Sequence, residues 1–85
     1  MTHDEALMIV NEEHRKAVKK YGPDYKNNDE FVCVLTEEFL EVLEAFKHND
    51  IYGKHGVVYE LAQLGAVCLK GLEGYSIPDD WVGES

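Results

Sequence analysis

Residues 57–72 read VVYELAQLGAVCLKGL, and this stretch decides the fold. Every residue in it is apolar or glycine except Tyr59, Glu60, Gln63 and Lys70. A helix that is apolar around most of its circumference is usually buried. Glycine in a helix interior costs about 1 kcal/mol relative to alanine, so we expect close backbone packing at Gly65. The stretch therefore predicts a buried helix against which the rest of the chain packs.

A first helix is predicted near the start of the chain. Residues 2–5 have the form of a capping box, in which Thr2 is the cap and Glu5 stands three residues later. Apolar residues then recur at helical spacing as far as Tyr21. The helix is expected to end at Gly22-Pro23, because proline cannot continue the hydrogen-bond ladder.

A second helix is expected to have Asn28 or Asp29 as its cap and to run to about residue 48. Its apolar face is broad and consists of Phe31, Val32, Leu35, Phe39, Val42, Leu43 and Phe46. No segment has the alternation of a strand, and no internal repeat is present. The predicted fold class is therefore all-α, and the short connections favour an antiparallel helical bundle of three main helices.

The 85 residues are expected to form a single domain. Its core covers about residues 2–74, and a C-terminal tail over residues 75–85 is expected to dock through Ile77 and Trp81. A chain this short buries only about 60–65% of the surface that it exposes when unfolded. A three-helix monomer would also leave the last helix half uncovered. We therefore expect a homodimer or homotetramer in which helices from two chains complete the bundle.

The charge and cysteine content exclude several classes of protein. Eight basic and seventeen acidic side chains give a net charge of −9, which disfavours sequence-independent binding of nucleic acid. No apolar run approaches the ~20 residues of a membrane span, and the N-terminus lacks the pattern of a signal peptide. Cys33 and Cys68 are too few for a disulfide framework. A reducing, cytoplasmic location is expected.

Acidic residues gather on the second helix at helical spacing. Glu38 and Glu41 share one face, and Glu37 lies one turn from Glu41. A helical projection places Glu38 at the border of the apolar face and Glu60 between apolar positions of the buried helix. A carboxylate in such a place needs a partner, which a magnesium ion could supply. The simpler alternative, an acidic helix with solvated glutamates, stays open.

The acidic residues also follow a known pattern. Glu37-Glu38-x-x-Glu41, followed after eighteen residues by Glu60-x-x-Gln63, resembles the EExxE…ExxD signature of the all-α NTP pyrophosphohydrolase superfamily, the MazG-like proteins. Residues 35–73 are the closest part, and the ELAQ segment that begins at Glu60 is similar to a variant found in short, phage-type members.

The first helix resembles the family more loosely. Glu13 and Gly22 fit the family pattern and Tyr21 stands where an aromatic residue is expected, whereas His14 and Ala17 depart from it. Taken together, the resemblance covers about residues 9–74.

The resemblance implies hydrolysis of a nucleoside triphosphate, NTP or dNTP, to the monophosphate and pyrophosphate. It also implies that Mg²⁺, or Mn²⁺ in its place, is held by Glu38, Glu41, Glu60 and Gln63. Glu37 would be a further ligand or a base that activates water, which makes the catalytic set Glu37, Glu38, Glu41 and Glu60. The family usually has aspartate where this chain has Gln63, and an amide oxygen can coordinate a metal but carries no charge.

Four basic residues are candidate contacts for the substrate phosphates, or else ordinary surface bases: Arg15, Lys19, Lys54 and Lys70.

A second class of function also remains open, a non-catalytic helical binding or assembly module with the same fold. Gln63 favours that alternative, whereas the convergence of Glu38, Glu41 and Glu60 favours the enzyme.

Overall fold

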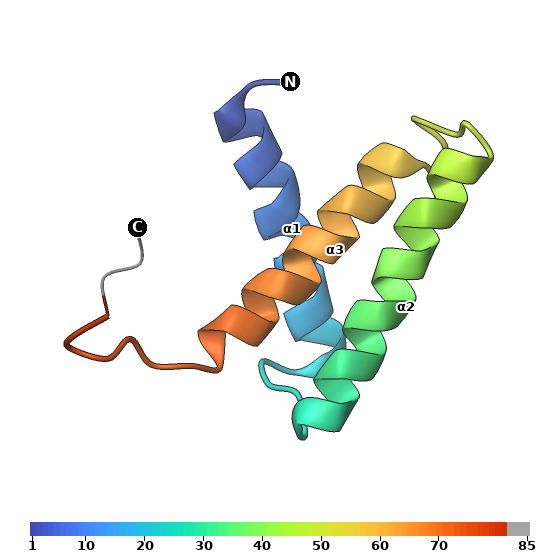
Figure 1. Cartoon of the computed structure of the whole chain (residues 1–85). Coiled ribbons are helices and arrows are strands. Elements are labelled where there is room, and N and C mark those ends of the chain that lie inside the picture. Colours follow the sequence, from blue (N-terminus) through green and yellow to red (C-terminus); the bar gives the residue numbers. More distant parts are fainter. Residues whose placement is uncertain (82–85) are drawn as a thin grey trace.

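The structure, a computed structural model, describes residues 1–81 and contains three helices (Figure 1). They are α1 (His3–Tyr21), α2 (Asn28–Lys47) and α3 (Val57–Glu73). The described part of the chain has no strand, so the predicted all-α class is confirmed. Within residues 1–81, no helix is both long enough and apolar enough to cross a bilayer.

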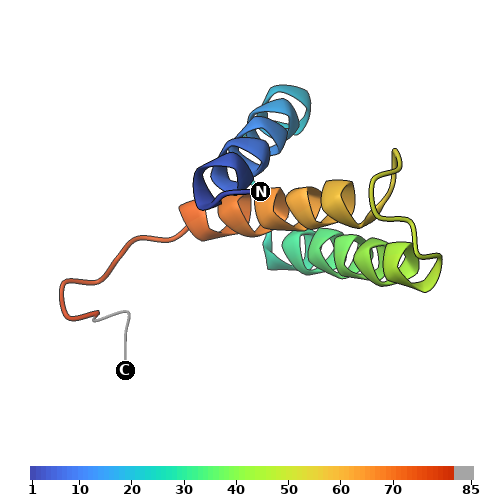
Figure 2. The same ribbon diagram turned by 90° about the horizontal axis from the view of Figure 1, so that it is seen from above.

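The helix α3 lies between the other two. The helices α2 and α3 form an antiparallel hairpin, and α1 crosses α3 obliquely (Figure 2). Both α1 and α2 pack on α3, but within the described residues they do not pack on each other. The bundle is therefore more open than the antiparallel arrangement that the short connections suggested, and the reason is that α1 uses its apolar stripe on α3 alone.

Gly65 lies where α1 and α3 come together. A Cβ atom added at Gly65 would stand 3.0 Å from Cγ2 of Val10, so the close packing expected at this glycine is confirmed. One turn further along α1, Nε2 of His14 lies 2.5 Å from Oε1 of Glu73 at the end of α3. These contacts fix the angle at which α1 lies across α3.

The helix ends follow the sequence signals closely. The capping box of α1 is confirmed, because the backbone N–H of Glu5 donates to Oγ1 of Thr2 at 3.1 Å and the backbone N–H of Thr2 donates to Oε1 of Glu5 at 2.8 Å. The cap of α2 is Asn27 rather than Asn28 or Asp29. Its side-chain oxygen accepts a hydrogen bond from the backbone N–H of Glu30 at 2.8 Å.

The buried apolar core is small. It consists of Val42, Ala45, Val57, Ala62 and Ala66, and α1 contributes no buried residue. The apolar face predicted on α2 is only partly covered by α3, since the side chains of Phe39 and Phe46 are 51% and 53% exposed. Cys33 and Cys68 are free and exposed.

The expected docking of the C-terminal tail is wrong for the residues described. Ile77 and Trp81 are 79% and 63% exposed, and the chain leads away from the helices after α3 (Figure 1). The hollow beside these side chains is lined by the last residues of α3 and by the tail itself. Residues 82–85 of the predicted tail lie outside the described part of the chain.

Candidate metal centre

Three glutamates from two helices converge beside the α2–α3 hairpin. Glu38 and Glu41 lie three residues apart on α2, which places them on one face of that helix. Because α3 runs antiparallel to α2, Glu60 in the first turn of α3 lies opposite them. One carboxylate oxygen from each residue lies within 4.8 Å of the other two. We call these three residues the glutamate triad.

The triad becomes less exposed from Glu41 to Glu60. Glu41 is exposed, Glu38 is half-buried and Glu60 is only 2% exposed. Oε1 of Glu60 lies 3.2 Å from Nδ1 of His55, which belongs to the connection before α3. Oε2 of Glu38 and Oε2 of Glu60 are both buried and have no hydrogen-bond donor among residues 1–81. A buried oxygen without a donor is costly unless another electropositive partner is present.

The three carboxylates perturb one another. Burial, together with the nearby carboxylates of Glu60 and Glu41, raises the pKa of Glu38 to about 9. Burial and the charge of Glu60 also raise the pKa of Glu41. Burial alone would raise the pKa of Glu60, but its interactions with the carboxyl groups of Glu38 and Glu41 and with His55 outweigh burial and lower that pKa. Without a cation, a proton on Glu38 therefore relieves the repulsion within the triad.

The residues of the triad fit a magnesium ion. Mg²⁺ prefers carboxylate and water oxygens at about 2.1 Å, which places neighbouring ligand oxygens about 3 to 4 Å apart. The separation of up to 4.8 Å is slightly larger, and small rotations of glutamate side chains would close the difference. A divalent cation would also supply the partner that the buried oxygens of Glu38 and Glu60 lack.

Glu37 and Gln63, the other two residues predicted for the site, have different surroundings from the triad. Glu37 is exposed one residue before Glu38. The amide nitrogen of Gln63 donates a short hydrogen bond to Oε1 of Glu13 on α1, and Oε2 of Glu13 lies 3.0 Å from Nζ of Lys16. An aspartate at position 63 would face the carboxylate of Glu13, so glutamine suits this contact. Gln63 therefore joins α3 to α1 here.

Two residues that contact Gln63 or Glu60, namely Glu13 and His55, were not predicted as site residues. Glu13 is one turn beyond Val10, and the contact between Val10 and Gly65 brings it onto α3. In the sequence, the glycine at position 65 and the match of Glu13 to the family pattern were the signals for this arrangement. His55 reaches Glu60 because the connection folds back over the start of α3, and no sequence pattern marks it.

Two hollows adjoin the triad. The first, of about 370 Å³, lies beside the connection between α2 and α3, and its lining includes Glu41, Glu60, His48 and His55. The second, of about 580 Å³, is bounded by all three helices. We call it the tyrosine cleft, and its lining includes Tyr21, Tyr25, Glu38, Gln63 and Lys70.

The four basic residues considered as phosphate contacts have different surroundings. The guanidinium of Arg15 is held by Glu12 on the same helix, with 2.6 Å between Nη2 and Oε1. Neither Arg15 nor Lys19 nor Lys54 lines either hollow. Lys70 does line the tyrosine cleft and is only 6% exposed, so it is not an ordinary surface base.

Comparison of the chain with protein-family models, with curated proteins and with solved structures found no match. The function is therefore argued from the residues of the site and from their resemblance to the MazG-like signature.

Proposed function

We propose that this protein is a magnesium-dependent nucleoside triphosphate pyrophosphohydrolase of the MazG-like type. The observation that carries the proposal is the convergence of Glu38, Glu41 and Glu60, with two buried oxygens that have no donor among the described residues. These glutamates are the positions that match the acidic residues of the family signature. The open hollows on both sides of the triad leave room for a substrate.

Glu38, Glu41 and Glu60 would hold the magnesium ion. Bound Mg²⁺ would reverse the local sign of charge, neutralise the phosphoryl oxygens and orient the attacking water at the α-phosphorus. Glu37 lies beside the triad and lines the tyrosine cleft, from where its carboxylate could accept a proton from that water. Gln63 would stabilise the position of α1 beside the site through Glu13.

The proposal includes a homo-oligomer, a dimer or a tetramer. Large apolar side chains stay exposed along α2 and α3, namely Val32, Phe39, Leu40, Leu43, Phe46, Leu61 and Leu72. No side chain of the described residues is completely buried, so one chain supplies a very small core. A second copy that covered these faces would add the apolar burial that so short a chain lacks.

A non-catalytic binding or assembly module is the second candidate function. The observation that favours it is Gln63, because its amide is engaged with Glu13 and adds no negative charge to the triad. Such a module would keep the glutamates as a purely structural cation site or as a protonated cluster.

A screen for pyrophosphate release separates the two candidates. The protein is incubated with each common NTP and dNTP, with and without magnesium. The proposal predicts release that requires magnesium, that is lost in Glu41→Gln, and that persists in the matched control Glu12→Gln on the outer part of α1. Exposed Glu41 can be changed with little effect on folding. A well-folded protein that releases no pyrophosphate from any of these substrates would favour the non-catalytic module.

A further inference from the structure

Lys70 is buried without a carboxylate partner. The residue is 6% exposed, yet none of the carboxylates in residues 1–81 forms an ion pair or a hydrogen bond with its ammonium group. Within residues 1–81, the ammonium group makes a cation–π contact, since Nζ lies 4.2 Å from the centre of the Tyr25 ring. An ammonium group has three hydrogen-bond donors, and because Nζ is not among the buried atoms of residues 1–81 that lack a partner, these donors stay accessible to solvent and to a ligand.

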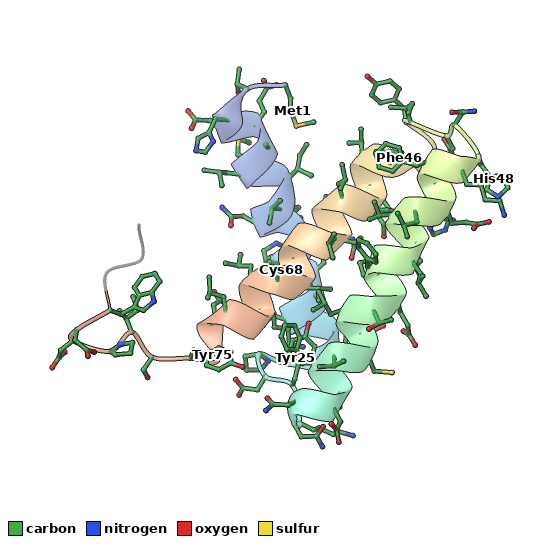
Figure 3. All side chains as sticks on the ribbon, in the orientation of Figure 1. Met1, Tyr25, Phe46, His48, Cys68 and Tyr75 are labelled. Atoms are coloured by element: carbon green, nitrogen blue, oxygen red, sulfur yellow. The ribbon has the colours of Figure 1, made fainter. Side chains whose placement is uncertain are left out.

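This ammonium group belongs to the tyrosine cleft, which begins at the glutamate triad. Glu38 and Gln63 line the cleft at the triad end, and Lys70 follows Gln63 by seven residues on the same side of α3. Seven residues span about 10 Å of helix. Figure 3 shows Tyr25 at the end of the helices opposite His48, which lines the other hollow. The cleft therefore leads from the triad to Tyr25 and Lys70.

We propose that the tyrosine cleft binds the nucleoside end of the substrate and that the Lys70 ammonium donates to a carbonyl oxygen of the base. This inference rests on the proposed function, because it takes the phosphates to lie at the triad. Bases that carry a carbonyl oxygen would be preferred over adenine, which has an amino group instead. The ring of Tyr21, which is 68% exposed and lines the same cleft, is available to stack on the base.

The charges that line the cleft away from the triad balance. Lys26 and Lys70 line it together with Glu30 and Glu37. Two ammonium groups and two carboxylates leave no excess of positive charge to attract a phosphate group, whereas an uncharged base needs none. The aromatic rings of Tyr21 and Tyr25 likewise suit a flat base, since stacking on an aromatic side chain contributes favourably whatever the base.

The test is calorimetric binding of UMP, AMP and pyrophosphate to the full chain in the presence of magnesium. We expect wild-type protein to bind UMP more tightly than AMP. Lys70→Met should weaken UMP binding roughly tenfold or more, while binding of AMP and of pyrophosphate changes little. Lys47→Met makes the same charge change at an exposed position at the end of α2 and should bind all three ligands as the wild type does.

Folding of Lys70→Met is checked by its melting temperature. Tyr21→Ala, at an exposed position, is a second variant and should weaken both UMP and AMP. The inference is overturned if the wild type does not bind UMP, if Lys70→Met binds UMP as tightly as the wild type, or if Lys70→Met loses pyrophosphate binding equally, which would make Lys70 a phosphate contact. The binding test is independent of hydrolysis. If UMP binding depends on Lys70 but the protein releases no pyrophosphate from any triphosphate, the proposed function is contradicted and this inference is not.

Discussion

Glu38 on α2 and Glu60 on α3 interact across the helix hairpin, and each keeps one buried oxygen without a hydrogen-bond donor among residues 1–81. Two carboxylates in such proximity cannot both carry a full charge at low cost. A proton can relieve the repulsion, as the raised pKa of Glu38 indicates, and a divalent cation can relieve it more completely. The predictions below follow from this competition between proton and metal.

Magnesium should stabilise the folded protein. The unfolded chain does not hold the three glutamates together, so the ion binds the native state preferentially. At a concentration one hundred times the dissociation constant, one such site adds about 2.7 kcal/mol to the free energy of unfolding. The measurement is the melting temperature across a magnesium titration, with sodium chloride of equal ionic strength as control. An unchanged melting temperature at millimolar magnesium would indicate glutamates without a metal site.

The stability of the metal-free protein should fall as the pH rises from about 5 to 9. The pKa of Glu38 is about 9 in the folded state, above the ordinary value of about 4.3 expected after unfolding. The contribution of Glu38 is therefore complete below the unfolded pKa and is lost as the pH rises through the folded pKa. Chemical denaturation at several pH values in a chelator measures this trend.

Magnesium should remove or reverse this dependence on pH, because it binds the deprotonated carboxylates. If the metal-free protein became more stable between pH 5 and pH 8, the interaction of Glu38 with Glu60 could not be the one described.

Gly71→Ala should destabilise the protein. An alanine Cβ at this position would overlap the ring of Phe31, which itself stacks on Tyr25 with 4.9 Å between ring centres. Overpacking of this kind typically costs about 1–3 kcal/mol. Glycine to alanine in an open helix position instead gains about 1 kcal/mol. Urea denaturation of the wild type and of Gly71→Ala gives the sign of the change in the free energy of unfolding. An increase in stability would show that α2 and α3 are not packed closely at Phe31.

The protein should be a dimer or a tetramer at micromolar concentration. The exposed apolar side chains along α2 and α3 give the physical reason, because a single chain covers few of them. Sedimentation velocity measures the mass directly. A well-folded monomer of 9.7 kDa at these concentrations would refute the expectation.

Much of the fold could be predicted from the sequence because its signals are local. The capping box at Thr2 and Glu5 and the nearly continuous apolar stretch from Val57 place two helices within a residue or two of their observed bounds. The meeting of Glu38 and Glu41 with Glu60 could also be anticipated, since helical periodicity and a short connection suffice to bring them together.

The remaining features depend on how the helices cross, which no local pattern encodes. The contact between Glu13 and Gln63 exists because α1 packs on α3 and not on α2. Lys70 offers a similar case, because its position in the sequence does not show that its charge faces a cleft instead of solvent. The tail illustrates the opposite error, since Trp81 is apolar enough to suggest docking and yet lies exposed.

The most direct test of the metal centre is the unfolding of Glu60→Gln without metal, compared with the wild type. If Glu60 serves a cation shared with Glu38 and Glu41, its carboxylate is held without metal only by the proton on Glu38 and by exposed His55. A glutamine oxygen can also accept a hydrogen bond from protonated Glu38, so the variant should lose at most about 1 kcal/mol of stability. A loss of about 3–5 kcal/mol would instead show that Glu60 is half of a buried ion pair, and would contradict the metal centre.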